Sequence, residues 1–141
     1  MKSTRRIVGI FIILLMVTLA TNLSAAQSTT EQKTDPKTVP VIDGAAGSCT
    51  AEFTVNDGAG APVYNAKIRV HIDYRWGGFH KLDLEVGTNV DGKARFEGLP
   101  AKTKRGLTYY ATHGDQEGSA FVDPAENCKA QMTITLAKKN P

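Results

Sequence analysis

Hydrophobic and polar residues alternate with a period of two through most of the chain beyond residue 48. In the stretch 49–55, CTAEFTV, every second residue is apolar, and the same alternation recurs in 67–74, 81–86 and 128–136. Strict alternation is typical of strands that bury one face and expose the other. No segment of this region carries the 3.6-residue spacing of an amphipathic helix.

Turn-forming residues separate these stretches at short, regular intervals. The segments NDGAGAP (56–62), NVDGK (89–93) and GDQEG (114–118) are rich in glycine, aspartate and asparagine. Such residues supply the backbone conformations that tight turns need. Many short strands joined by tight turns predict an all-β fold, an antiparallel β-sandwich of seven or eight strands.

The beginning of the chain has the pattern of an export signal. Basic residues precede an uncharged apolar run at 7–20, and small residues follow at 24–26. This pattern predicts a signal peptide over residues 1–26, cleaved after Ala26. A retained anchor is the alternative, but the run extended to Leu23 has only about 17 residues, the short limit for crossing a bilayer. We therefore expect a periplasmic or secreted protein.

The remaining chain divides into three parts. Residues 27–47 begin with a polar stretch that contains Pro36 and Pro40 and has no apolar period, which predicts a flexible linker. The sandwich domain is expected over residues 48–137, and residues 138–141 form a short tail.

Charge gives no support to a nucleic-acid partner. The sequence carries 17 basic and 14 acidic residues, and three of the basic residues precede the apolar run of the leader. The chain beyond the leader therefore carries equal numbers of both. Nucleic-acid-binding proteins usually carry a basic surface, and the chain beyond the leader has no excess of basic residues from which to form one.

Cys49 and Cys128 are the only cysteines, and both fall on the apolar phase of their predicted strands. Export permits a disulfide, and two cysteines are too few for a zinc site. A bridge would close nearly the whole domain into one loop, with the two thiols meeting across the core. Two buried free thiols are the alternative.

The turn motifs resemble those of the carboxypeptidase regulatory-like domain, a prealbumin- or transthyretin-like β-sandwich with Ig-like architecture. The similarity covers roughly residues 49–136 and consists of a D-x-x-G-x-P turn, a T-x-x-D-G turn and a G-L-P strand end. It implies an accessory or adhesion-type role without catalysis. The matching residues are Asp57, Gly60, Pro62, Thr88, Asp91, Gly92, Phe96, Gly98, Leu99 and Pro100.

The same region is similar to the transthyretin and hydroxyisourate hydrolase group, which raises an enzymatic alternative. That group carries a histidine where this chain has Thr54, and an arginine where it has Lys93. Lysine lacks the planar fork with which arginine holds an anion at two points. The chain also ends in TLAKKNP rather than in the Tyr-Arg-Gly-Ser tail of the hydrolases, so we expect no enzyme activity.

The loop after residue 74 is the candidate ligand site. Trp76 is the only tryptophan, and Arg75, Phe79 and His80 flank it around a Gly-Gly pair. Trp76 is in phase with the buried positions, which favours a cap on the end of the core. The functional alternative is an exposed platform for a sugar ring, a peptide or a partner protein, since loops at sandwich ends often carry such sites.

Two smaller groups of polar side chains are further candidates for a metal or binding site. His71 and Asp73 share a strand face, but a metal centre needs at least three converging ligands, so no metal is expected. The basic loop 102–105 could contact an acidic polymer or a partner, although three charges are usually a solvated loop tip.

These observations predict an exported β-sandwich with a binding or structural role and no cofactor. The expected partner is a protein or a component of the cell envelope, without nucleic acid and without a stable membrane span after cleavage. A carbohydrate-binding module that uses the Trp76 loop is the first alternative, and an atypical transthyretin-like hydrolase is the second.

Overall fold

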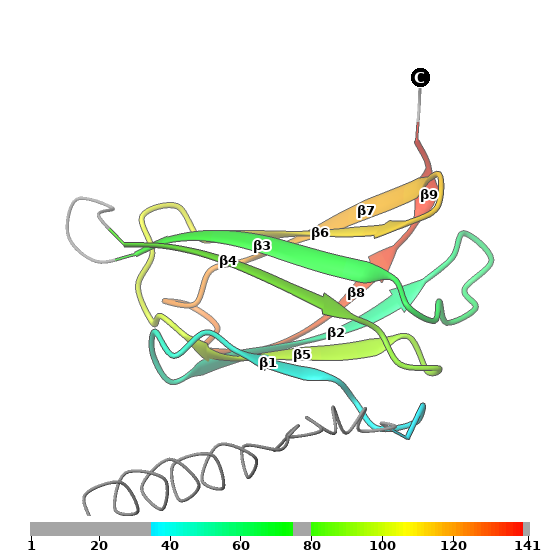
Figure 1. Cartoon of the computed structure of the whole chain (residues 1–141). Coiled ribbons are helices and arrows are strands. Elements are labelled where there is room, and N and C mark those ends of the chain that lie inside the picture. Colours follow the sequence, from blue (N-terminus) through cyan, green and yellow to red (C-terminus); the bar gives the residue numbers. More distant parts are fainter. Residues whose placement is uncertain (1–34, 75–79, 140–141) are drawn as a thin grey trace, which may run out of the picture. The chain divides into compact units, whose positions relative to one another are not determined.

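A computed structural model describes residues 35–74 and 80–139, and these residues form two β-sheets (Figure 1). Within this part of the chain no helix is long and apolar enough to cross a membrane. The strands are β1 (Val41–Asp43), β2 (Cys49–Asn56), β3 (Lys67–Tyr74), β4 (His80–Gly87), β5 (Lys93–Leu99), β6 (Leu107–His113), β7 (Gln116–Val122), β8 (Lys129–Thr135) and β9 (Ala137–Lys138).

The two sheets form the two layers of a β-sandwich, which confirms the expected fold class (Figure 1). Sheet A has the strand order β1-β5-β2-β8, and sheet B has the order β4-β3-β6-β7-β9. Two pairs in sheet A, β1 with β5 and β2 with β8, are parallel rather than antiparallel. Alternation identifies the buried face of a strand but not the direction of its neighbour, so the sequence did not predict these pairs.

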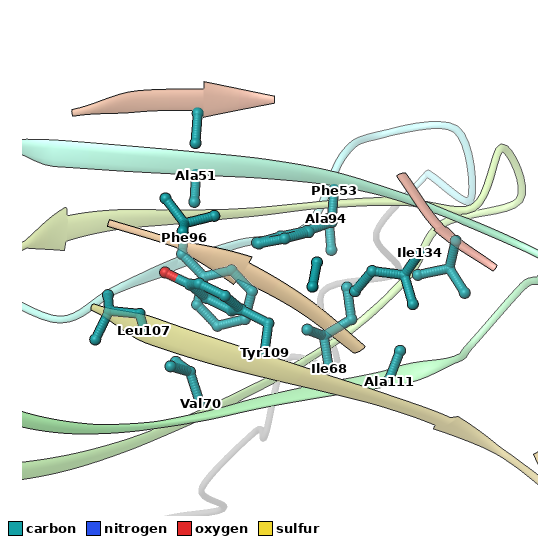
Figure 2. Close-up of a cluster of buried hydrophobic side chains, with 14 of the residues drawn as sticks. Ala51, Phe53, Ile68, Val70, Ala94, Phe96, Leu107, Tyr109, Ala111 and Ile134 are labelled. Atoms are coloured by element: carbon teal, nitrogen blue, oxygen red, sulfur yellow. The ribbon is translucent and has the colours of Figure 1, made fainter. Parts of the chain in front are cut away.

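The core lies between the sheets and is built from the apolar phase of each strand. Phe53 on β2, Phe96 on β5 and Tyr109 on β6 are fully buried and pack their rings together at its centre (Figure 2). Ring centroids lie 4.4 Å apart for Phe53 and Tyr109, and 5.1 Å apart for Phe96 and Tyr109. Tilted and edge-on ring pairs of this kind add stability beyond the burial of their area.

The Cys49–Cys128 disulfide is present, as the sequence predicted. It joins the beginnings of β2 and β8, which are neighbouring parallel strands of sheet A, with Thr50 opposite Lys129. The bridge therefore lies within one sheet, and the expectation that the two thiols meet across the core is wrong. The bonded residues are 79 positions apart, for which the chain-entropy model gives about 4–5 kcal/mol of stabilisation.

The segment before residue 48 differs from the expected flexible linker in its second half. Val41–Asp43 form β1 against β5, and the amide of Arg95 donates to the Pro40 carbonyl at 2.9 Å. The Asn89 side-chain amide donates to the Lys37 carbonyl at 2.8 Å. Polar composition suggested a linker, but backbone pairing with the edge of β5 and packing of Ile42 against the core order this stretch.

Candidate functional site

The structure places only part of the predicted ligand site. Arg75, Trp76 and Phe79 lie outside the described residues. His80 is the first residue of β4 and is exposed, with its ring centroid 5.6 Å from that of Tyr74. The choice between a core cap and a ligand platform at Trp76 therefore stays a prediction.

The T-N-x-D-G motif has a structural role in this fold. Thr88 and Asn89 are buried, and the Thr88 hydroxyl donates to the Val63 carbonyl and accepts from the Ala66 amide. The Asn89 side-chain carbonyl accepts from the amides of Asp91 and Lys93. Both polar side chains thus satisfy buried backbone groups around the β4–β5 turn.

The two positions that correspond to the catalytic histidine and arginine of the hydrolases are neighbours on sheet A, and neither of them is a histidine. Thr54 on β2 is directly opposite Lys93 on β5, and both side chains point outward. The three histidines of the sequence lie on β3, β4 and β6 of sheet B. Among residues 35–74 and 80–139, no group of three or more acidic, histidine or cysteine side chains is placed to hold a metal ion.

The outward face of sheet B carries a ladder of ion pairs between β3 and β4. Arg69 is opposite Glu85, and the arginine side chain donates to the glutamate carboxylate. Lys67 approaches the same carboxylate at 3.3 Å. The Arg69 guanidinium, with help from Lys67, holds the pKa of Glu85 below its usual range. Opposite charges on directly paired residues stabilise the strand register, modestly because they face water.

His71 lies in the middle of this ladder between two carboxylates. Its Nδ1 is 2.6 Å from Asp83 on β4, and its Nε2 is 3.5 Å from Asp73 on β3. The hydrogen bond and charge of Asp83, and then the charge of Asp73, raise the pKa of His71 above its usual value despite the opposing charge of Lys81. The imidazole is therefore poised to carry a proton and to donate from both nitrogens.

Two large aromatic side chains stand beside this ladder on the same face. Tyr110 on β6 is 58% exposed and Phe121 on β7 is 56% exposed. Because Tyr110 is opposite Ser119, Phe121 is its diagonal neighbour across the strand pair, within reach of a long aromatic side chain. Thus two exposed rings lie on neighbouring strands of the same outward face.

The ion pairs and Tyr110 line an open groove with a volume of about 660 Å³. Its walls come from β3, β4 and β6 and from the loop before β6, where Arg105 and Gly106 contribute. A smaller hollow of about 280 Å³ adjoins it and is lined by His71, Asp73, Lys104, Arg105 and Gly106. We call this surface the sheet B outer face. It offers ring contacts, charged donors and charged acceptors to a ligand.

Sequence reasoning identified the charges of this face but missed its aromatic residues. Tyr110 and Phe121 occupy the outward phase of LTYYATH and SAFV, where alternation calls for polar residues. That departure from the alternation was the available signal. The two large rings at outward positions are not packed in the core, and neighbouring exposed apolar side chains can mark an interaction site.

Comparisons with known proteins find distant structural neighbours and no family. No protein-family model matches the chain, and no curated protein does. A catechol 1,2-dioxygenase from an Acinetobacter species is 12% identical over 73% of this chain and 60% of its own, with a TM-score of 0.46. A 3-chlorocatechol 1,2-dioxygenase from Rhodococcus opacus is 15% identical over 74% of this chain and 65% of its own, with a TM-score of 0.46.

The C-terminal domain of a shaft pilin from Lactobacillus rhamnosus is a further neighbour. It is 11% identical over 65% of this chain and 98% of its own, with a TM-score of 0.39. The chain spans less than two thirds of the length of the dioxygenases that it matches. Likenesses of this degree carry no argument about activity or partners.

Proposed function

We propose that this chain is an exported, non-catalytic β-sandwich module that binds another protein through the sheet B outer face. The observation that carries the proposal is the pair of exposed rings, Tyr110 and Phe121, beside the Arg69 and His71 ion pairs. The resemblance to carboxypeptidase regulatory-like domains in the turn motifs agrees with an accessory role of this kind.

Residue types on this face favour a protein partner. Aromatic residues and arginine are enriched in protein interfaces and among the residues that dominate binding energy. Aromatic side chains bury large areas at a small entropic cost, and arginine donates several hydrogen bonds from one group. The groove is open to solvent, and charged residues of β3 and β4 contribute much of its lining. A surface of this form suits an extended or flat protein segment better than a deeply enclosed small molecule.

Export is supported by two independent features. The leader-like pattern of residues 1–26 predicts secretion, and the Cys49–Cys128 bridge is of a kind that usually forms and persists in oxidising compartments. The non-catalytic part of the proposal rests on Thr54 and Lys93, which stand where the related hydrolases carry histidine and arginine. The carbohydrate alternative depends on Trp76, which lies outside the described residues.

Site-specific photo-crosslinking in the cells that export the chain tests the proposal. A photoreactive phenylalanine analogue would replace Phe121 on sheet B or, as a matched control, Gln131 on β8 of sheet A. Both positions are outward and exposed. We expect a discrete protein adduct from position 121 and none from position 131.

The adduct should disappear when Tyr110→Ser is introduced beside the crosslinker at position 121, because the neighbouring ring then no longer contributes to binding. Adducts of equal yield from both faces would contradict the proposal. An adduct at position 121 whose added mass a glycosidase removes would favour the carbohydrate alternative.

A further inference from the structure

We infer that the segment bound by the sheet B outer face is an acidic peptide, with carboxylates held by Arg105 and Lys104 and an apolar side chain placed on Tyr110 and Phe121. This inference rests on the proposed function and adds the chemistry of the partner.

The acidic residues of the face are already matched by its own cations. Glu85 receives Arg69 and Lys67, while Asp83 and Asp73 flank His71. These pairs lie along β3 and β4, so their carboxylates already have cationic partners within the protein. A basic partner would have to displace a pair that the strand register already aligns.

Among the described residues, the unmatched cations of the face are Lys81 on β4 and the basic residues in the loop between β5 and β6. Within the described part of the chain, neither Lys104 nor Arg105 has a carboxylate within ion-pair distance, and no acidic residue occurs between Pro100 and Gly106. Arg105 lines both hollows, and Lys104 lines the smaller one. A guanidinium at the junction of two hollows can bind a carboxylate at two points.

The fold fixes this basic loop next to the exposed rings. Gly106 has φ +71°, and a Cβ at this position would collide with the ring of Phe121, so the aromatic side chain packs directly on the loop backbone. At the other end of the loop, Thr103 forms a β-bridge with Tyr74 at the end of β3. The loop closes the end of the sandwich where β3 ends and β4 begins (Figure 1). Cations and rings therefore form one continuous surface.

The distribution of charge favours a peptide over an acidic polysaccharide. A polyuronate carries a negative charge on every ring, and a chain lying along the groove would bring some of these charges against Asp83 and Glu85. A peptide can place its carboxylates at Arg105 and an uncharged, apolar residue at Tyr110. Like charges directly opposed across an interface are unfavourable, which selects against the polysaccharide.

Fluorescence anisotropy with two labelled peptides tests this inference on the purified full chain. The first peptide has two glutamates followed by an apolar half rich in leucine, and the second has glutamines in place of the glutamates. The test variant is Lys104→Gln/Arg105→Gln. The matched control, Lys93→Gln/Lys129→Gln, removes the same charge from the outward face of sheet A.

We expect the wild type to bind the glutamate peptide about tenfold more tightly than the glutamine peptide, as charge-assisted hydrogen bonds to arginine imply. The Lys104→Gln/Arg105→Gln variant should lose this preference, and the sheet A control should keep it. Equal affinity for both peptides, no binding of the glutamate peptide, or an equal loss in the control variant would overturn the inference. Binding of polygalacturonate that depends on Arg105, in place of the glutamate peptide, would also overturn it.

The two proposals fail in different ways. If the glutamate preference is absent but the protein adduct at position 121 still depends on Tyr110, the acidic partner is wrong and the protein-binding face stands. If the adduct is absent as well, both proposals fall.

Discussion

The two outer faces of the sandwich differ in chemistry although they follow the same alternation of buried and exposed positions. Sheet A presents short hydroxyl side chains and charged or amide residues on β2, β5 and β8, and no large ring. Sheet B presents an ion-pair ladder, a histidine between two carboxylates and two exposed aromatic rings. The outward residues of β2, β5 and β8 are Thr50, Glu52, Thr54, Asn56, Lys93, Arg95, Glu97, Lys129, Gln131, Thr133 and Thr135, and the short edge strand β1 adds Asp43 and the exposed aliphatic Val41.

The difference shows how a solvated face and a candidate binding face can be told apart on one scaffold. Both faces carry ion pairs, between Arg95 and Glu97 along β5 in sheet A and between Arg69 and Glu85 across β3 and β4 in sheet B. Such pairs explain register and solubility but no binding. Exposed apolar side chains that gather on one face, rather than occurring singly, are typical of interaction sites. Aromatic content therefore distinguishes the faces better than charge does.

The largest expected effect concerns the disulfide, which stabilises the whole sandwich rather than either outer face. Replacing the disulfide, as Cys49→Ser/Cys128→Ser, should lower the free energy of unfolding by about 4 kcal/mol, because the unfolded chain regains the entropy of a long loop. Urea denaturation of the purified variant and wild type measures the change. A variant as stable as the wild type would contradict this account of the bridge.

The second prediction sharpens the comparison between the faces directly. The variant Tyr110→Ser/Phe121→Ser should weaken binding of the crosslinked partner by about 2 kcal/mol, as expected for central aromatic residues of an interface. The matched sheet A variant Gln131→Ser/Thr133→Ser should bind as the wild type does. Titration calorimetry with the recovered partner measures both. Equal losses from the two variants would contradict a single binding face.

The third prediction contrasts two adjacent tyrosines that point to opposite sides of β6. Tyr109 is fully buried, its burial raises the pKa of its hydroxyl, and among the described residues that hydroxyl has no hydrogen-bond partner (Figure 2). A buried hydroxyl without a partner costs about 1 kcal/mol or more, so Tyr109→Phe should raise the free energy of unfolding by about that amount.

Tyr110→Phe is the control, because the neighbouring hydroxyl is in water. Its free energy of unfolding should stay within about 0.5 kcal/mol of the wild type. Chemical denaturation of both variants side by side gives the comparison. A loss of stability in Tyr109→Phe would mean that the buried hydroxyl has a partner.

The fourth and smallest effect concerns the pH dependence of the sheet B outer face. Asp83 and Asp73 raise the pKa of His71, so the protonated imidazole is favoured more in the folded than in the unfolded chain. The resulting stabilisation is fully present below about pH 6.5, the ordinary value of histidine. It is lost as the pH rises through the raised value of the folded state.

An NMR titration of the His71 ring checks this sign. The midpoint should lie above the ordinary value in the wild type and fall in Asp83→Asn, where the charge and the ionic hydrogen bond are removed. A midpoint unchanged by Asp83→Asn would contradict the ion pair. Replacement of Asp123, which lies in the turn after β7, serves as a control that leaves the His71 midpoint unchanged.

Much of the fold could be predicted from the sequence, because burial with a period of two follows directly from the geometry of a strand. The alternation in 49–55 matches the buried and half-exposed positions of β2 one for one, and the Cys49–Cys128 bridge formed as expected. Strand partners could not be predicted in this way. Alternation says which face is buried and not which strand lies alongside, so the parallel β2–β8 pair and the disulfide within one sheet went unforeseen.

The candidate site was harder to predict for a different reason. Its charges lie on β3, β4 and the β5–β6 loop, and its rings lie on β6 and β7, so the register of four strands is needed to bring them together. The single tryptophan instead led to a predicted ligand site at residues 75–80. The local signs of this face in the sequence were the basic loop 102–105 and the out-of-phase rings Tyr110 and Phe121.

Photochemical footprinting of both faces tests the central claim most directly, because it requires no knowledge of the partner. A small diazirine reagent would label the exported protein in its native cellular setting and after purification, and mass spectrometry would quantify the label on each strand. The account predicts that Tyr110 and Phe121 are protected in the native setting relative to the purified protein, while Gln131 and Thr133 are labelled equally in both. Equal labelling of Tyr110 and Phe121 in the two settings, or protection confined to sheet A, would contradict it.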